Sequence, residues 1–267
     1  MIRVNNKEID MRHFPDGTML IKYLADLEYA TITWLYDSDE ECMGVYFLTK
    51  HLRTHGVKRI DLFMPYIPNA RMDRVKNPDE VFTLKYFAEF INGLEFGSVE
   101  VLDPHSNVSA ALIDNISIIE PTDIVSNLLE NVNADGNTVL FFPDEGAMKR
   151  YSHIASACDV PYVFGMKKRD WRTGEILGLN VLGETDIVSG KNILIVDDIC
   201  SRGGTFLHSA KALKAMGATN IDLYVSHLEN YVWEGEMITS GLIRTLYTTN
   251  SIYRLGNKET VVVVEEY

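Results

Sequence analysis

The sequence predicts an α/β protein of two domains, each a mainly parallel sheet flanked by helices. Short β-rich runs recur along the 267 residues, and helical patterns lie between several of them. The runs are continuously apolar rather than alternating, which is typical of strands covered on both faces. They are too many for one small sheet, and the chain is long enough to bury a core in each of two domains.

Six segments carry the predicted strands, namely 29–34, 59–64, 98–102, 138–142, 192–196 and 221–226. The polar segment 120–137 separates the first three from the last three. We therefore expect one domain at 1–118 and a second at 119–267.

Two intervening segments have helical signals. In the first, 80–92, five apolar residues recur on one helical stripe: Val81, Leu84, Phe87, Ala88 and Ile91. The second, 205–218, is a predicted helix that ends at Gly217, because glycine readily adopts the left-handed conformation found after helices.

Composition excludes several functional classes. The net charge of −13 argues against a nucleic-acid partner, which requires a basic face. Cys42, Cys158 and Cys200 are too isolated to form a disulfide framework. No apolar run approaches the roughly 20 residues of a membrane helix, and the amino terminus lacks the apolar core of a signal peptide. A cytoplasmic protein with no membrane partner is expected.

Two adjacent carboxylates follow the predicted strand 192–196 and precede a glycine-rich turn. Asp197 and Asp198 come first, and the next helix opens with the loop Ser201, Arg202, Gly203, Gly204 and Thr205. Ligands of open parallel sheets bind beyond the carboxyl ends of the strands. Glycine-rich amides at a helix amino terminus suit a phosphate, and the acids suit hydroxyls or a metal. A phosphorylated sugar has both parts, whereas the structural alternative is a strand followed by a capping loop.

Several segments resemble one known family. "VDDICSRGGT" resembles the phosphoribosyl-diphosphate motif of the phosphoribosyltransferase fold. "RHFPDG" (12–17), "FMPYIPNARMDR" (63–74), "VLDPHS" (101–106), "FFPDEGAMKRY" (141–151), "GMKKRD" (165–170) and "LYVSHLENY" (223–231) resemble motifs of ribose-phosphate diphosphokinases, in that family's order. The chain thus resembles a shortened, divergent member with two phosphoribosyltransferase-like domains, a nucleotide side at 1–118 and a ribose-phosphate side at 119–267.

The resemblance implies transfer of the β,γ-diphosphate of ATP to the anomeric hydroxyl of a ribose 5-phosphate, releasing AMP, with Mg²⁺ as cofactor. It implies the ATP-binding residues Phe14, Asp16, Arg71, Asp73 and His105. It also implies metal contacts at His105 and Asp144, although a satisfied strand-end histidine is the alternative for His105. Asp197, Asp198 and the loop from Ser201 to Thr205 would bind the ribose phosphate.

Lys167 and Arg169 are the implied catalytic cations, on a polar loop able to close over phosphates and stabilise the leaving nucleotide. The alternative is a solvated basic loop. In this family a neighbouring subunit completes the nucleotide site, so the resemblance implies a homo-oligomer with that site near a subunit interface.

The departures from the family concern both substrates. Met72 replaces the glutamine that meets adenine, and Thr18 replaces an acid of the nucleotide loop. Arg202 adds a charge to the phosphate loop. The acceptor is therefore left open between ribose 5-phosphate and a 5-substituted relative such as ADP-ribose, used in NAD salvage. Two further alternatives are a phosphoribosyltransferase that consumes phosphoribosyl diphosphate and a non-catalytic regulatory paralogue of the synthetase.

Overall fold

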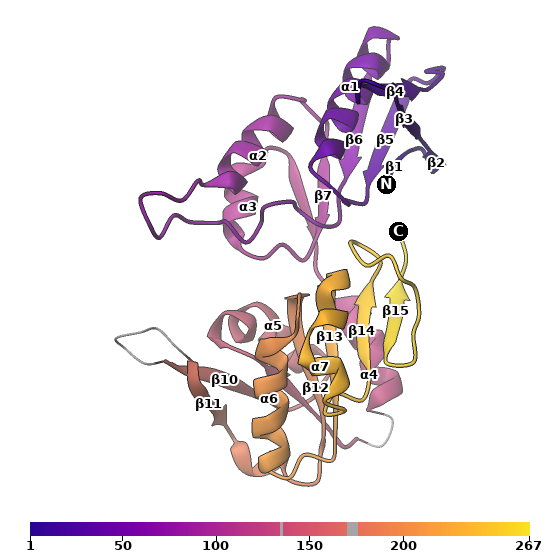
Figure 1. Ribbon diagram of the computed structural model, residues 1–267. Coiled ribbons are helices and arrows are strands. Elements are labelled where there is room, and N and C mark those ends of the chain that lie inside the picture. Colours follow the sequence, from indigo (N-terminus) through magenta and orange to yellow (C-terminus); the bar gives the residue numbers. More distant parts are fainter. Residues whose placement is uncertain (134–135, 170–175) are drawn as a thin grey trace. The chain divides into compact units, whose positions relative to one another are not determined.

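The computed structural model describes residues 1–133, 136–169 and 176–267, and of 167–169 and 176–177 only the backbone. The chain divides into two compact units, Met1–Glu120 and Pro121–Tyr267 (Figure 1). They are called the first and second unit below. No helix of the described ranges is long and apolar enough to span a membrane.

The first unit contains a six-stranded sheet in the order β2-β1-β5-β6-β7-β8. Its strands are β1 (Ile2–Val4), β2 (Lys7–Glu8), β5 (Tyr29–Trp34), β6 (Arg59–Phe63), β7 (Val99–Leu102) and β8 (Ile116–Ile119). The last four pair in parallel, and β1 pairs antiparallel with both neighbours. A separate antiparallel ribbon joins β3 (Asp10–His13) and β4 (Met19–Lys22).

The helices of the first unit are α1 (Glu40–Thr54), α2 (Thr83–Asn92) and α3 (Asn107–Leu112). Four of the five residues of the predicted stripe on α2 are buried in the core, namely Leu84, Phe87, Ala88 and Ile91. The prediction was wrong for Val81, which is exposed. The helix begins at Thr83, so Val81 precedes it and does not share its periodicity.

The second unit contains a seven-stranded sheet in the order β11-β10-β9-β12-β13-β14-β15. Its strands are β9 (Thr138–Phe142), β10 (Tyr162–Arg169), β11 (Ile176–Gly183), β12 (Asn192–Cys200), β13 (Asn220–Leu228), β14 (Leu246–Thr249) and β15 (Val261–Glu265). All neighbouring pairs are parallel except β10 with β11. The helices are α4 (Thr122–Val132), α5 (Glu145–Ala157), η1 (Thr185–Val188), α6 (Gly204–Ala215), η2 (Asn230–Glu234) and α7 (Glu236–Thr239).

The central strand β12 shows why its sequence is continuously apolar. Ile193 and Ile195 pack in a core cluster with residues of α6 and α7, whereas Leu194 and Val196 pack in a second cluster with residues of α4 and α5. Successive side chains of a strand point to opposite faces, so both faces of this sheet are covered. The predicted α/β class, with mainly parallel sheets flanked by helices, is confirmed.

The segment before Arg169 differs from the expected polar loop. Strand β10 continues through Lys167 and Lys168 to Arg169, and it pairs antiparallel with β11 across seven residue pairs. The apolar residues of "ILGLNVLG" (176–183) supply the second strand of this hairpin. Lys167 and Arg169 therefore lie on a strand, and their side chains lie outside the described part of the structure.

Candidate functional site

The candidate site begins at the carboxyl end of β12. This strand continues four residues beyond its apolar run, because Asp197, Ile199 and Cys200 still pair with β13. The strand therefore fixes the backbone of both Asp197 and Asp198 at the edge of the sheet where ligands of open parallel sheets bind. The backbone N–H of Asp198 also donates to Asp197 Oδ1 at 3.0 Å, which restrains the first carboxylate.

Arg150 of α5 joins the two carboxylates. Its Nη2 donates to Asp197 Oδ1 at 3.1 Å and to Asp198 Oδ1 at 2.6 Å. The Asp198 side chain is only 3% exposed, and the guanidinium also lies 5.0 Å from the centre of the Tyr151 ring. Charge-assisted hydrogen bonds of this kind are about twice as strong as neutral ones. The acid pair is thus preformed and carries one permanent counter-charge.

The surroundings of the acid pair shift the pKa of Asp197. Burial raises the pKa of Asp197 well above its ordinary range, and the neighbouring charge of Asp198 raises it further, whereas Arg150 lowers it. The acid pair brings two carboxylates against the single guanidinium of Arg150. It therefore suits a ligand that brings hydroxyl groups or a metal ion.

The glycine-rich loop follows directly. Gly203 has a φ of +77°, in the left-handed region that favours glycine, and α6 begins at the next residue. The first N–H groups of a helix have no partner within it, so the loop presents donors toward an anion. Ser201 and Arg202 precede Gly203, and Gly204 and Thr205 are the first two residues of α6. We call residues 201–205 the anion loop.

The anion loop is held from one side by the segment after β13. A Cβ atom on Gly235 would lie 1.9 Å from the Arg202 carbonyl oxygen, and one on Gly203 would lie 2.6 Å from Met237 Sδ. These two contacts require glycine, since a side chain would overlap its neighbour. The Arg202 side chain is 68% exposed, and its Nη2 pairs with Glu234 Oε2 at 2.9 Å.

Asp144 lies at the start of α5, the helix that carries Arg150. Its Oδ1 accepts from the N–H of Ala147 at 3.0 Å, which caps the helix. Its negative charge also contributes to the raised pKa of Asp197, so the two carboxylates are electrostatic neighbours. One helix thus positions both Asp144 and the arginine that binds the acid pair.

The predicted nucleotide residues lie in the first unit. Phe14 and Asp16 form the turn of the β3–β4 ribbon, where Asp16 Oδ1 accepts from the Thr18 N–H at 2.9 Å and from its hydroxyl at 2.7 Å. The Thr18 hydroxyl bond lowers the pKa of Asp16. Thr18, which replaces the family's acid, therefore fixes the conformation of the turn.

Arg71, Asp73 and His105 follow two neighbouring parallel strands of the first unit. Arg71 and Asp73 come after β6, and His105 comes after β7. The Leu102 N–H donates to the Pro65 carbonyl at 3.0 Å, which joins the two strand ends. These segments therefore lie at the carboxyl edge of the same sheet. Arg71 is exposed, whereas Asp73 and His105 are half-buried.

The described residues place few potential metal ligands close together. Among the described residues, no three histidine, cysteine, aspartate or glutamate side chains form a cluster able to hold a metal ion. Mg²⁺ usually keeps several waters and uses one or two carboxylates with substrate phosphates. Asp144 fits that kind of partial ligation, since it offers one carboxylate and no closed cage.

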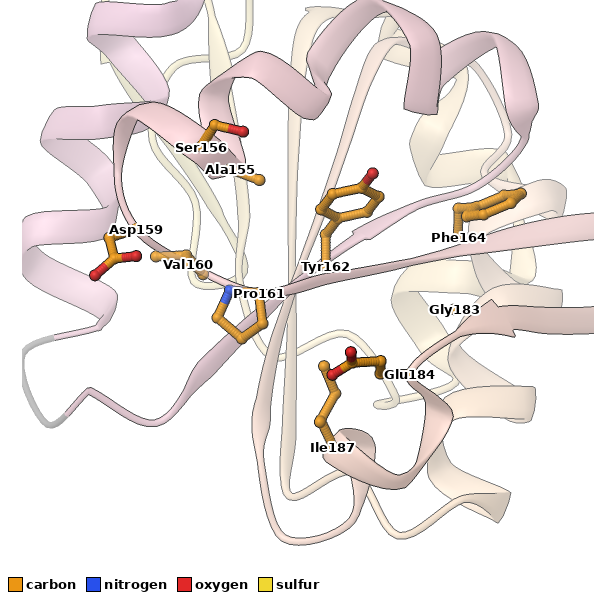
Figure 2. Close-up of a pocket in the computed structure, with 10 residues that line it drawn as sticks. All are labelled: Ala155, Ser156, Asp159, Val160, Pro161, Tyr162, Phe164, Gly183, Glu184 and Ile187. Carbon is orange, nitrogen blue, oxygen red and sulfur yellow. The ribbon is translucent and has the colours of Figure 1, made fainter.

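A pocket of about 560 Å³ lies elsewhere in the second unit, at the start of β10 (Figure 2). The described residues that line it include Tyr162 and the carboxylates of Asp159 and Glu184, and none of them is basic. Tyr162 lies level in the sheet with Leu140 and Leu194. Leu194 precedes Asp197 by three residues, so Tyr162 is not level with the acid pair. None of its lining residues supplies the positive charge that favours a phosphate, so it is not the candidate site.

The sequence analysis did not single out Arg150, which contacts both carboxylates of the acid pair. It lies in the segment "FFPDEGAMKRY", whose similarity to the family's motif is the only sequence signal for it. Its partners are 47 and 48 residues away in the chain, so its role depends on tertiary structure.

Comparisons with known proteins agree with this architecture. The chain is 30% identical over 224 residues to the ribose-phosphate pyrophosphokinase of Rhizobium meliloti, covering 81% of this chain and 69% of the relative. It is 24% identical over 269 residues to the ribose-phosphate pyrophosphokinase of Saccharolobus solfataricus, covering 98% of this chain and 89% of the relative.

Two further comparisons concern the fold. A family model described as phosphoribosyl transferase domain matches residues 113–235. The crystal structure of phosphoribosylpyrophosphate synthetase from Mycobacterium smegmatis is similar with a TM-score of 0.78, covering 97% of this chain and 86% of that chain, at 19% identity. This likeness extends over both units of the chain.

Proposed function

Because the chain belongs to the ribose-phosphate pyrophosphokinase family, we propose that it transfers the diphosphate of ATP to the anomeric hydroxyl of a ribose 5-phosphate group and releases AMP. The chain is an enzyme, a diphosphotransferase. The observation that carries the acceptor assignment is the order of two elements in the second unit. An acid pair, of which Asp198 is buried, lies near the carboxyl end of β12, and the anion loop leads into α6 a few residues later.

The acceptor would use both elements. Asp197 and Asp198 accept hydrogen bonds from ribose hydroxyls, directly or through a metal ion. The amides and hydroxyls of the anion loop, from Ser201 to Thr205, donate to the 5-phosphate. Arg150 supports this assignment, because it holds the two carboxylates in place at 3.1 and 2.6 Å.

The nucleotide would use the predicted residues of the first unit. Phe14, Asp16, Arg71, Asp73 and His105 are the proposed ATP contacts, and Arg71 is suited to pairing with phosphate or stacking on the base. Asp144 and, separately, His105 remain candidate ligands of magnesium ions, which would neutralise phosphate charge.

Lys167 and Arg169 are the proposed catalytic cations. Phosphoryl transfer depends mainly on positioning and on neutralising charge as it develops on the leaving group. The β10–β11 hairpin supports their role, because both residues lie near the end of β10. Strand β10 pairs in parallel with β9, and Asp144, which follows β9, caps α5.

The identity of the acceptor is the finer part of the proposal. Ribose 5-phosphate satisfies the acid pair and the anion loop, and a 5-substituted relative such as ADP-ribose would in addition place a second phosphate outside the loop. The exposed Arg202 supports the larger acceptor. Among the described ion pairs its guanidinium pairs with Glu234 alone, and that pair is exposed, so a ligand phosphate can replace Glu234. A homo-oligomer that completes the nucleotide site is part of the same proposal.

The test is an incubation with ATP, Mg²⁺ and each acceptor, analysed by mass spectrometry. The proposal predicts a product heavier than the acceptor by one diphosphate, formed together with one AMP. Formation of ADP and a product heavier by a single phosphate would contradict diphosphate transfer. Diphosphate release from phosphoribosyl diphosphate and a free base, with no ATP-dependent product, would favour the phosphoribosyltransferase alternative.

A further inference from the structure

The short helix η2 is fixed against the anion loop. Gly235 directly follows η2, and its backbone approaches Arg202 so closely that no side chain fits between them. The Glu229 N–H, just before η2, donates to the Cys200 carbonyl at 2.9 Å. Both ends of η2 are therefore tied to the residues that flank the start of the anion loop.

The three faces of η2 have different environments. In a 3₁₀-helix, residues three apart lie on the same face. Val232 is fully buried and faces the core. Asn230 shares a face with Trp233. The Oδ1 atom of Asn230 accepts a hydrogen bond from the Arg254 N–H at 3.3 Å. The third face carries Tyr231 and Glu234, the residue that pairs with Arg202.

Tyr231 therefore lies on the same face of η2 as Glu234, the partner of Arg202. Its side chain is 57% exposed, although tyrosine usually buries most of its ring when it serves packing. A planar, exposed ring on the helix face that pairs with an arginine is suited to a ligand with both an aromatic group and a phosphate.

We propose that Arg202 and Tyr231 form a subsite for the 5-substituent of a large acceptor, one that carries a diphosphate-linked aromatic base. Arg202 leaves Glu234 and binds the second phosphate, and the Tyr231 ring stacks on the base. This inference rests on the proposed function, because it assumes that the 5-phosphate occupies the anion loop. Glu234 then acts as the resting counter-charge that keeps Arg202 in place when the subsite is empty.

The test compares wild type, Tyr231→Ala and Tyr231→Phe on ADP-ribose and ribose 5-phosphate. Tyr231→Ala should lower kcat/KM on ADP-ribose about 10-fold, mainly through KM, because stacking is lost in both the bound substrate and the transition state. It should change kcat/KM on ribose 5-phosphate less than about 2-fold. Tyr231→Phe should retain most of the activity on ADP-ribose, since the ring is kept.

Tyr29→Ala is the matched control, because Tyr29 is 62% exposed but lies at the start of β5 in the first unit. Thermal melts of all variants check that folding is unchanged. Equal losses of Tyr231→Ala on both acceptors, or no loss on ADP-ribose, would overturn the subsite.

The subsite and the proposed function can fail separately. Turnover of ribose 5-phosphate without turnover of ADP-ribose by wild type would overturn the subsite and leave the family activity intact. Should neither acceptor be turned over, the proposed function fails. Calorimetric binding of ADP-ribose then decides the subsite alone: weaker binding by Tyr231→Ala than by Tyr231→Phe supports it, and equal binding overturns it.

Discussion

Two arginine–carboxylate pairs of the second unit use the same chemical groups in different surroundings. Arg150 binds the acid pair, and its partner Asp198 is only 3% exposed. Arg202 binds Glu234, whose side chain is 54% exposed. The first pair connects α5 to the central strand β12, and the second connects the anion loop to η2.

The difference in burial separates their roles. Removing one partner of a buried pair leaves an uncompensated charge and costs about 3–5 kcal/mol, whereas exposed pairs contribute about 0–1 kcal/mol. Arg150 is therefore expected to stay with the acids in every state of the enzyme. Arg202 can exchange Glu234 for a ligand phosphate at little cost.

Arg150→Ala should have the largest effect on stability. It leaves Asp197 and Asp198 close together without their counter-charge, and we expect a loss of about 2–4 kcal/mol in the free energy of unfolding, somewhat below the fully buried case because Arg150 is partly exposed. Urea unfolding measures this loss. Lys149→Ala is the control, since Lys149 pairs with Glu145 on the exposed side of the same helix at 2.7 Å. Equal losses for the two variants would remove the distinction between the buried and exposed pairs.

Asp197→Asn should change the free energy of unfolding less than Arg150→Ala does, and its effect should depend on pH. A carboxyl whose pKa is raised by folding stabilises the folded state at low pH, and that contribution is lost as the pH rises above the ordinary carboxyl range near pH 4. The variant removes this pH-dependent loss, while Arg150 keeps Asp198 as a partner. Thermal unfolding from about pH 4 to pH 7 should show the variant gaining stability relative to wild type. If wild type instead becomes more stable relative to the variant as the pH rises, the pKa of Asp197 is not raised by folding.

Glu234→Gln should have the smallest effect on stability. The pair it breaks is exposed on both sides, so we expect a change within about 0.5 kcal/mol in the free energy of unfolding. The same variant releases Arg202 and should bind ADP-ribose slightly more tightly than wild type does. A destabilisation as large as that of Arg150→Ala would show that the Arg202–Glu234 pair is structural.

The sequence predicted the parts of the fold that depend on local pattern. The apolar run 192–196 correctly indicated a strand covered on both faces, because its four apolar residues, from Ile193 to Val196, alternate between two cores. The run could not indicate that β12 continues to Cys200, since pairing with β13 carries two polar residues into the strand. The short strands β1 to β4 also escaped prediction, because they are only two to four residues long.

The candidate site was predictable where its chemistry is contiguous in sequence. Asp197, Asp198 and the anion loop lie within nine residues and could be recognised together. Arg150 and Glu234 could not be assigned to them from the sequence, because they reach the site from α5 and η2 through tertiary contacts. The roles of Lys167 and Arg169, and those of the nucleotide residues, remain predictions.

The central claim is that the acceptor binds at the end of β12 and the nucleotide does not. Calorimetric titration of ribose 5-phosphate and of ATP with Mg²⁺ into wild type and Asp197→Asn tests it directly. The variant should lose about 1.5–3 kcal/mol of binding free energy for ribose 5-phosphate, as for a hydrogen bond to a charged group, and should keep its affinity for ATP. Loss of ATP affinity with ribose 5-phosphate affinity retained would contradict the account and reverse the assignment of the two substrates.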